Sequence, residues 1–205
     1  MRTYNSPRRA DAALATRAAI LDAGRELFLA KGYAKVTVAE IASRARVAVQ
    51  TVYGSTGGKA AILQALLDPV LEDPAVEETL AGIAATDDPR EVIAVTAGGT
   101  RRAHERHWEL MRGLYYSTSA GPAVATVMDK ATLAYLAALT AVADRLIALD
   151  ALKPELDRQA AVDLLWYFLG RSGWYTLVAD RAWDFDRAEA QLSAAAQQAL
   201  LRLDP

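Results

Sequence analysis

The feature that most constrains this sequence is a long apolar stripe that follows Pro122. Apolar side chains recur there every three or four residues, at Val124, Met128, Ala131, Tyr135, Ala138, Val142, Leu146 and Leu149. This spacing is that of one face of an α-helix, continued for about seven turns or roughly 40 Å. Sustained alternation of apolar and polar residues, which marks a half-buried strand, is found nowhere in the chain. The sequence therefore predicts an all-α protein of about nine helices.

Capping chemistry places several helix starts. Asp88 precedes Pro89, and an acidic N-cap before proline at the first helical position is typical of a helix start. Further starts are interpreted in the same way at Pro122, at Pro154 and at Asp184, the last capping a helix from about Phe185. Three Asp-Pro pairs mark residues 68–90 as the least regular stretch.

The segment from Ala160 to Leu169 is apolar around nearly its whole circumference, interrupted only by Asp163. Such a helix must be covered on nearly all sides, by its own core on one face and by a partner chain on the other. The last helix carries an apolar stripe at Phe185, Ala188, Leu192, Ala195 and Ala199. We predict a homodimer through about residues 155–179 and 184–203. The alternative is a single buried central helix in a monomer.

Charge is divided unevenly along the chain. Residues 1–66 hold ten Lys/Arg and four Asp/Glu, a net +6, whereas residues 67–205 hold 13 and 21, a net −8. A basic third on an acidic body indicates an anionic partner for that third, although chance surface variation is the alternative.

Several classes of function are disfavoured. Zero cysteines exclude a disulfide framework, a cysteine nucleophile and a thiolate metal site. Gly98-Gly99-Thr100 lacks the lysine and spacing of a phosphate-binding loop, and His104 and His107 have no predictable third metal ligand. We expect no enzyme, no cofactor and no metal site. No apolar run approaches about 18 residues and the N-terminus lacks a secretory signal, so we expect a cytoplasmic protein without membrane contact.

The N-terminal third contains the pattern of a helix-turn-helix unit. Residues 17–45 read as two amphipathic helices, the first ending at Lys31-Gly32. Thr37 and Glu40 fit a capping box at the start of the second. A tight break over residues 45–47 precedes another short helix over about 49–54. In such a unit the helix after the turn enters the DNA major groove.

This third resembles the DNA-binding domain of the TetR family. The resemblance rests on Ile20-Leu21-Asp22-Ala23, Leu27-Phe28, Lys31-Gly32-Tyr33, Thr37-Val38, Ile41-Ala42, Ala45, Val47, Thr51-Val52-Tyr53, Lys59 and Ile62-Leu63. It implies a helix-turn-helix domain over residues 1–66, with a flexible arm over 1–11 that carries Arg2, Arg8 and Arg9. Residues 67–205 would form a helical regulatory and dimerisation domain. Members of this family are dimeric transcriptional regulators that a small molecule typically releases from a two-fold operator.

Particular side chains suit contact with DNA. Gln50 has the donor and acceptor pair that suits adenine. Thr51 can use its hydroxyl, or its methyl against thymine, and Val49 offers apolar contact to a thymine methyl. Phosphate contacts are predicted for Thr37, Tyr53, Ser55 and Lys59, which match the family's positions for that role. Arg44 is predicted to reach the backbone or a base.

Four residues depart from the family pattern. Arg46 stands where the turn usually has glycine, and Ala48 stands where serine or threonine usually caps the recognition helix. Ser55 and Thr56 replace the usual histidine and aromatic residue. These departures motivate the alternative function, a ligand-binding or sequestering protein with a degenerate DNA-binding domain.

Aromatic and thioether residues favour a small-molecule pocket in the C-terminal part, since such pockets have apolar walls with few polar groups. The candidate lining residues are His104, Trp108, Met111, Tyr115, Tyr135, Trp166 and Leu169. They predict a small, largely apolar or aromatic effector that would release a repressor. The alternative is that these aromatic side chains form an ordinary core.

Overall fold

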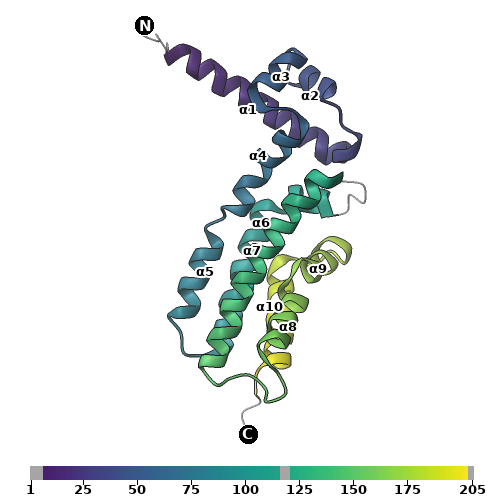
Figure 1. Cartoon of the computed structure of the whole chain (residues 1–205). Coiled ribbons are helices and arrows are strands. Elements are labelled where there is room, and N and C mark those ends of the chain that lie inside the picture. The colour runs from purple at the N-terminus through teal and green to yellow at the C-terminus, as the bar shows by residue number, and fades with distance from the viewer. Residues whose placement is uncertain (1–6, 116–120, 203–205) are drawn as a thin grey trace. The chain divides into compact units, whose positions relative to one another are not determined.

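The computed structural model describes residues 7–115 and 121–202, and within them it contains helices and no β-strand (Figure 1). A single antiparallel bridge joins Leu152 to Leu201. The elements are α1 (Pro7–Lys31), η1 (Tyr33–Lys35), α2 (Val38–Arg44), α3 (Val49–Thr56), α4 (Lys59–Leu71), α5 (Ala75–Ala84), α6 (Pro89–Tyr115), α7 (Gly121–Ala148), α8 (Arg158–Leu169), α9 (Arg171–Trp174), the π-helical η2 (Tyr175–Asp180) and α10 (Phe185–Leu200). The predicted all-α class is confirmed.

The chain divides into two compact units. The first comprises residues 1–71 with 109–129, and the second comprises residues 72–108 with 130–205. Both α6 and α7 contribute to each unit. The domain boundary predicted at residues 66–67 stays a sequence-based interpretation.

In the first unit α1 packs against α2, α3 and α4. Its core contains Ile20, Ala23, Phe28, Ile41, Val52 and Ile62, all buried. Gly24 permits close approach of α1 and α4, because a Cβ at this position would lie 2.6 Å from Ile62 Cγ2. The apolar periodicity of the sequence thus positions three short helices against one long one.

In the second unit one apolar core joins residues from α5 to α10. Its fully buried members include Ile93, Leu139, Leu165 and Trp174. Figure 1 shows α8 and α10 side by side, and these two helices are in direct contact. The predicted long helix is present as α7, most of which belongs to this unit, and the predicted last helix is present as α10.

Helix starts that depend on local capping agree with the sequence. Asp88 Oδ1 accepts a 2.8 Å hydrogen bond from Arg90 N beside Pro89, the first residue of α6. Asp184 Oδ1 accepts a 2.7 Å hydrogen bond from Arg187 N at the start of α10.

Other local predictions were wrong. Pro154 does not open a helix, because α8 begins at Arg158 and Asp157 caps it by accepting from Ala160 N at 2.8 Å. Residues 68–90 are more regular than predicted, since α4 continues through Pro69 and α5 follows. α1 begins at Pro7, so residues 7–11 of the predicted arm are helical. The remainder of that arm, including Arg2, lies outside the described residues.

One helical segment is long and apolar enough to cross a membrane by length and composition alone. It spans Met128–Ala148 with a mean hydropathy of 1.4. The prediction that no apolar run approaches this length was therefore wrong. Core helices of soluble proteins meet the same test, and Leu139, Val142 and Leu146 of this segment are buried in the second unit's core.

Candidate functional site

The start of α2 is fixed by the predicted capping box. Glu40 N donates to the Thr37 hydroxyl at 3.2 Å, and Thr37 N donates to Glu40 Oε2 at 2.8 Å. Lys31 Nζ reaches the other carboxylate oxygen of Glu40 at 2.7 Å. The hydrogen bond from Lys31, followed by those from Thr37, lowers the pKa of Glu40 to about 2. The Thr37 side chain, a predicted phosphate ligand, is exposed and already has this local role.

The turn between α2 and α3 is tight and hydrogen-bonded. Ala45 N donates to Ile41 O at 2.9 Å, and Val47 N donates to Ala42 O at 2.9 Å. Arg46 adopts φ +57°, in the left-handed region that favours glycine. The predicted break over residues 45–47 is therefore present, with arginine in a conformation that arginine disfavours.

Helix α3 turns one face inward and one outward. Val52 is fully buried, whereas Val49 is 42% exposed and Tyr53 is 53% exposed. Gln50 and Thr51 are exposed as well, so the three predicted base-reading residues share the solvent side. Ala48, at the N-cap of α3, provides no side-chain hydrogen bond, as the sequence predicts.

The Tyr53 ring lies close to Gly58, which follows the end of the same helix. A Cβ at Gly58 would lie 2.9 Å from Tyr53 Cε1, and the φ of Gly58 is +100°. Glycine at this position lets the Tyr53 ring lie against the backbone while the side chain stays half-exposed.

Lys59 differs from its prediction. Its Nζ donates to Val36 O at 2.8 Å and to Tyr33 O at 3.0 Å, with a longer contact of 3.5 Å to Ala34 O. It also lies 4.4 Å from the centroid of the Tyr33 ring. Three carbonyl oxygens match the three hydrogens of an ammonium group. Lys59 therefore joins the start of α4 to η1 instead of presenting a free charge to a phosphate.

Arg44 and Ser55 have internal contacts too. Arg44 Nη2 lies 2.5 Å from Glu26 Oε2, and both side chains are more than half exposed. The Ser55 carbonyl accepts a 2.8 Å hydrogen bond from Arg17 Nη1, and its side chain is partly exposed. Thr56, a departure from the family pattern, is buried and its hydroxyl donates to Val52 O at 2.8 Å. The Thr56 side chain therefore forms a hydrogen bond within α3, on the buried side of that helix.

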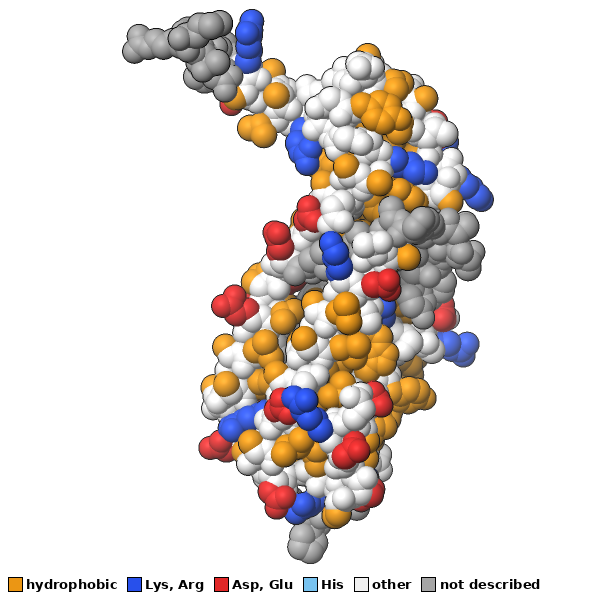
Figure 2. Space-filling model, in the orientation of Figure 1, with side chains coloured by type: hydrophobic (Ala, Val, Ile, Leu, Met, Phe, Trp, Pro, Cys, Tyr) orange, Lys and Arg blue, Asp and Glu red, His pale blue; other side chains and the backbone are white. Residues whose placement is uncertain are grey.

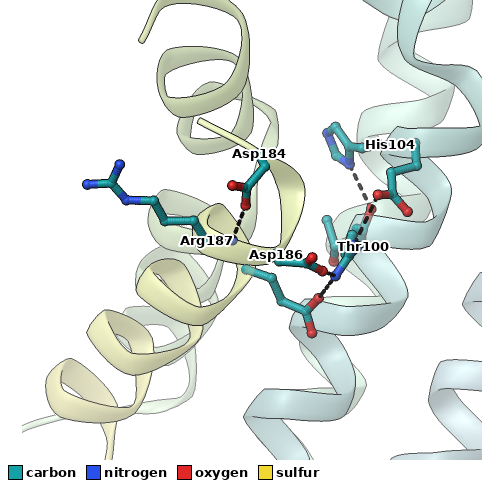
Figure 3. Close-up of polar contacts among 8 residues, drawn as sticks. Thr100, His104, Asp184, Asp186 and Arg187 are labelled. Atoms are coloured by element: carbon teal, nitrogen blue, oxygen red, sulfur yellow. Dashed lines mark hydrogen bonds and ion pairs between the residues drawn. The ribbon is translucent and has the colours of Figure 1, made fainter. Parts of the chain in front are cut away.

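An aromatic cluster in the second unit surrounds His104. The imidazole stacks on Trp174 with ring centroids 5.5 Å apart, and Trp108 lies 5.2 Å from Tyr175 and 5.2 Å from Phe185. His104 Nδ1 lies 2.8 Å from Thr100 O (Figure 3). Burial lowers the pKa of His104 to about 4, so the ring is neutral at physiological pH.

Thr100 connects this cluster to Tyr135. The Tyr135 hydroxyl lies 2.9 Å from Thr100 Oγ1 and donates to Leu169 O at 2.9 Å. Its ring centroid is 5.7 Å from that of Trp166, and burial raises the pKa of Tyr135. Predicted pocket residues from α6, α7 and α8 thus meet through Thr100. The sequence does not place Thr100 in the pocket, because its Tyr135 partner lies 35 residues away on another helix.

Two predicted pocket residues are not brought into this group. Met111 is buried but belongs to the first unit. Tyr115 is the last residue of α6, and its side chain lies outside the described residues. The first unit contains a cavity of about 360 Å³ lined by Leu29, Glu109, Arg112 and Gly113. None of these residues was predicted to line a pocket.

Arg101 secures the start of α10 beside the aromatic cluster. It pairs with Glu189 at 3.0 Å, with Asp186, and with Glu105 at 3.2 Å. Figure 3 shows Asp184 and Asp186 at the start of α10, opposite Thr100 and His104 on α6. These ion pairs raise the pKa of Arg101.

Comparison with known proteins identifies the N-terminal part. Residues 20–66 match the family model described as bacterial regulatory proteins, tetR family. No curated protein matches the chain significantly. The matched family comprises regulatory proteins, in agreement with the expectation of a non-enzymatic chain.

Solved structures resemble the whole chain. The SmeT–triclosan complex has a TM-score of 0.72 and 21% identity, with 92% of each chain covered. NalD, the secondary repressor of the MexAB-OprM multidrug efflux pump in Pseudomonas aeruginosa, has a TM-score of 0.72 and 22% identity, covering 94% of this chain and 98% of its own. FadR from Bacillus subtilis in complex with stearoyl-CoA has a TM-score of 0.70 and 18% identity, covering 88% and 97%. These likenesses show a shared fold.

Proposed function

We propose a homodimeric repressor, because the chain carries the N-terminal domain of the tetR family of bacterial regulatory proteins and is thus a DNA-binding transcriptional regulator. Each subunit reads one half of a two-fold operator, and a small, largely apolar effector releases it. The repressor role and the effector are parts of this proposal.

The observation that carries the proposal is the exposed face of α3. Val49, Gln50 and Thr51 are exposed, while Val52 anchors the helix in the core of the first unit. Glutamine can bond both N6 and N7 of adenine, and the valine and threonine methyl groups suit a thymine methyl. Thr37, Arg44, Tyr53 and Ser55 stay predicted contacts for the DNA backbone, whereas the internal hydrogen bonds of Lys59 lead us to propose a role in stability for that residue.

The dimer is proposed through about residues 155–179 and 184–203. Leu165 and Leu169 of α8 are fully buried against the core, whereas Tyr167 on the opposite side is 69% exposed. Figure 2 shows apolar side chains gathered on the face of the second unit that this view presents. An exposed tyrosine on an otherwise apolar helix is typical of an interface between subunits. A second copy of α8 and α10 would cover it.

The effector is proposed to contact the aromatic group around His104, Trp108, Tyr135, Trp166 and Leu169. Neutral His104 and the Tyr135 hydroxyl would supply the few polar contacts that orient an apolar ligand. Among proteins of this fold, SmeT has been solved with triclosan, and FadR from Bacillus subtilis has been solved with stearoyl-CoA, whose acyl chain is apolar. The effector releases the dimer from the operator if it binds more tightly to a conformation in which the two recognition helices have a different spacing from the one that the operator requires.

In vitro selection from a random DNA library tests this function. We expect enrichment of a two-fold motif whose half-sites are separated by about 34–36 Å or a multiple of it. Screened effectors should then quench tryptophan fluorescence and lower the affinity for the enriched duplex. A folded dimer that enriches no sequence at low salt would contradict the proposal and favour the alternative, a ligand-sequestering protein.

A further inference from the structure

The turn that precedes α3 contains an arginine in an unfavourable backbone conformation. Arg46 has φ +57° and is exposed, so its side chain is not required to fill the core. The turn itself enforces this conformation through Val47 N, which donates to Ala42 O at 2.9 Å, and Arg46 N, which donates to Ser43 O at 3.2 Å. Glycine would fit the same turn without the steric cost of a Cβ. An exposed arginine here therefore costs stability without a compensating contact inside the fold.

Four other cations of this domain are engaged by the protein itself, whereas the exposed Arg25 and Lys35, like Arg46, make no ion pair with the described residues. Lys31 pairs with Glu40, and Arg44 pairs with Glu26. Lys59 and Arg17 donate to backbone carbonyl oxygens. Arg46, in contrast, makes no ion pair with any residue for which the structure gives a position. Its guanidinium is available to an external anion.

The position of Arg46 in the chain defines which anion that is. Arg46 lies two residues before the N-cap of α3, whose exposed Val49 and Gln50 face outward. When α3 lies in a major groove with its first residues on base edges, the preceding turn lies at the groove wall, which consists of phosphates. We propose that Arg46 binds a DNA backbone phosphate beside the bases that α3 reads, an inference that rests on the proposed function.

Arg46→Gly separates this role from a structural one because the two effects have opposite signs. Removing the Cβ relieves the strain, so the melting temperature should stay the same or rise by about 2 °C. Removing the guanidinium should weaken binding to enriched and random duplexes alike, by roughly tenfold for each subunit at low salt. The log–log salt dependence should become shallower by about 0.9 for each phosphate that the variant no longer binds. Arg46→Lys keeps the charge and should retain most of the affinity and slope.

Ala182→Gly is the matched control. Ala182 is exposed and has φ +55°, but it belongs to the second unit. It should show the same change in melting temperature with unchanged DNA affinity. Equal affinity and slope for wild type and Arg46→Gly would overturn the inference while leaving the proposed function intact. Failure of the wild-type protein to bind any DNA would overturn both.

Discussion

Lys59 Nζ donates a 2.8 Å hydrogen bond to the backbone oxygen of Val36, a residue 23 positions earlier in the chain. Together with the Tyr33 contacts, this bond fixes the start of α4 against η1. The ammonium group cannot donate all three of its hydrogens to DNA while it donates to these carbonyl oxygens.

We therefore expect Lys59→Met to act on stability. Loss of charged hydrogen bonds to partly buried carbonyls should lower the free energy of unfolding by about 1–3 kcal/mol, measured by urea denaturation. The salt dependence of DNA binding should not change. Lys35→Met, at an exposed position of η1, should leave stability near the wild-type value. Wild-type stability with a shallower salt dependence in the Lys59 variant would instead restore the phosphate role.

Gln50→Ala should change specificity. Because Gln50 is exposed near the start of α3 and suits adenine, its loss should cost about 1–3 kcal/mol at one base pair of each half-site. Anisotropy titrations with single-base-pair variants of the enriched duplex measure this. An equal loss of affinity on enriched and random DNA would refute the base-reading role.

Tyr53→Ala should weaken binding without regard to sequence. The Tyr53 ring lies against Gly58 and stays half-exposed, a position suited to a backbone contact. Tyr53→Phe keeps the packing and isolates the hydroxyl. If the phenylalanine variant binds both enriched and random DNA as wild type does, the hydroxyl makes no phosphate contact.

Tyr167→Arg should break the homodimer while leaving the subunit folded, because the side chain is 69% exposed in the single chain. Light scattering should give the wild type twice the 22.1 kDa chain mass and the variant the mass of one chain. Leu133→Arg is the control, since Leu133 is 68% exposed on α7, outside the proposed interface, and should remain dimeric. A wild-type protein with the mass of one chain would contradict the dimer.

Stability should fall as the pH drops from about 6.5 to about 4 because of His104. Burial lowers its pKa from 6.5 to about 4, so between these values the unfolded chain binds a proton that the folded chain does not. This contribution is fully present above pH 6.5, and about 3 kcal/mol is lost by pH 4. Urea denaturation at a series of pH values should show a flatter profile for His104→Phe. An NMR titration that charges His104 near pH 6.5 in the folded protein would contradict the prediction.

Sequence reasoning succeeded where the determinants are local. The capping box of Thr37 with Glu40 and the cap at Asp184 each depend on residues three positions apart, and both are present. The buried and exposed faces of α3 follow from helical periodicity. These features place the candidate DNA-reading residues without tertiary information.

The features that the sequence did not predict depend on hydrogen-bond partners distant in sequence, or on two local signals that compete for the same helix start. The sequence suggests a phosphate contact for Lys59, because the carbonyl partners of this residue lie 23 to 26 residues away and no pattern marks them. Pro154 by itself suggests a helix start, but Asp157 caps α8 instead. The hydrogen bonds that bring Thr100, Tyr135 and Leu169 together join three helices, which periodicity along one helix cannot predict.

The most direct test of the central claim is the affinity of the full chain for the enriched duplex and for a scrambled duplex at two salt concentrations. The account predicts tighter binding to the enriched duplex by a factor of about 10³ or more. For both duplexes, affinity should fall steeply with salt, at about −0.9 in log–log slope for each phosphate contacted. Equal, weak binding of both duplexes by a folded dimer would contradict the claim that α3 reads a DNA sequence.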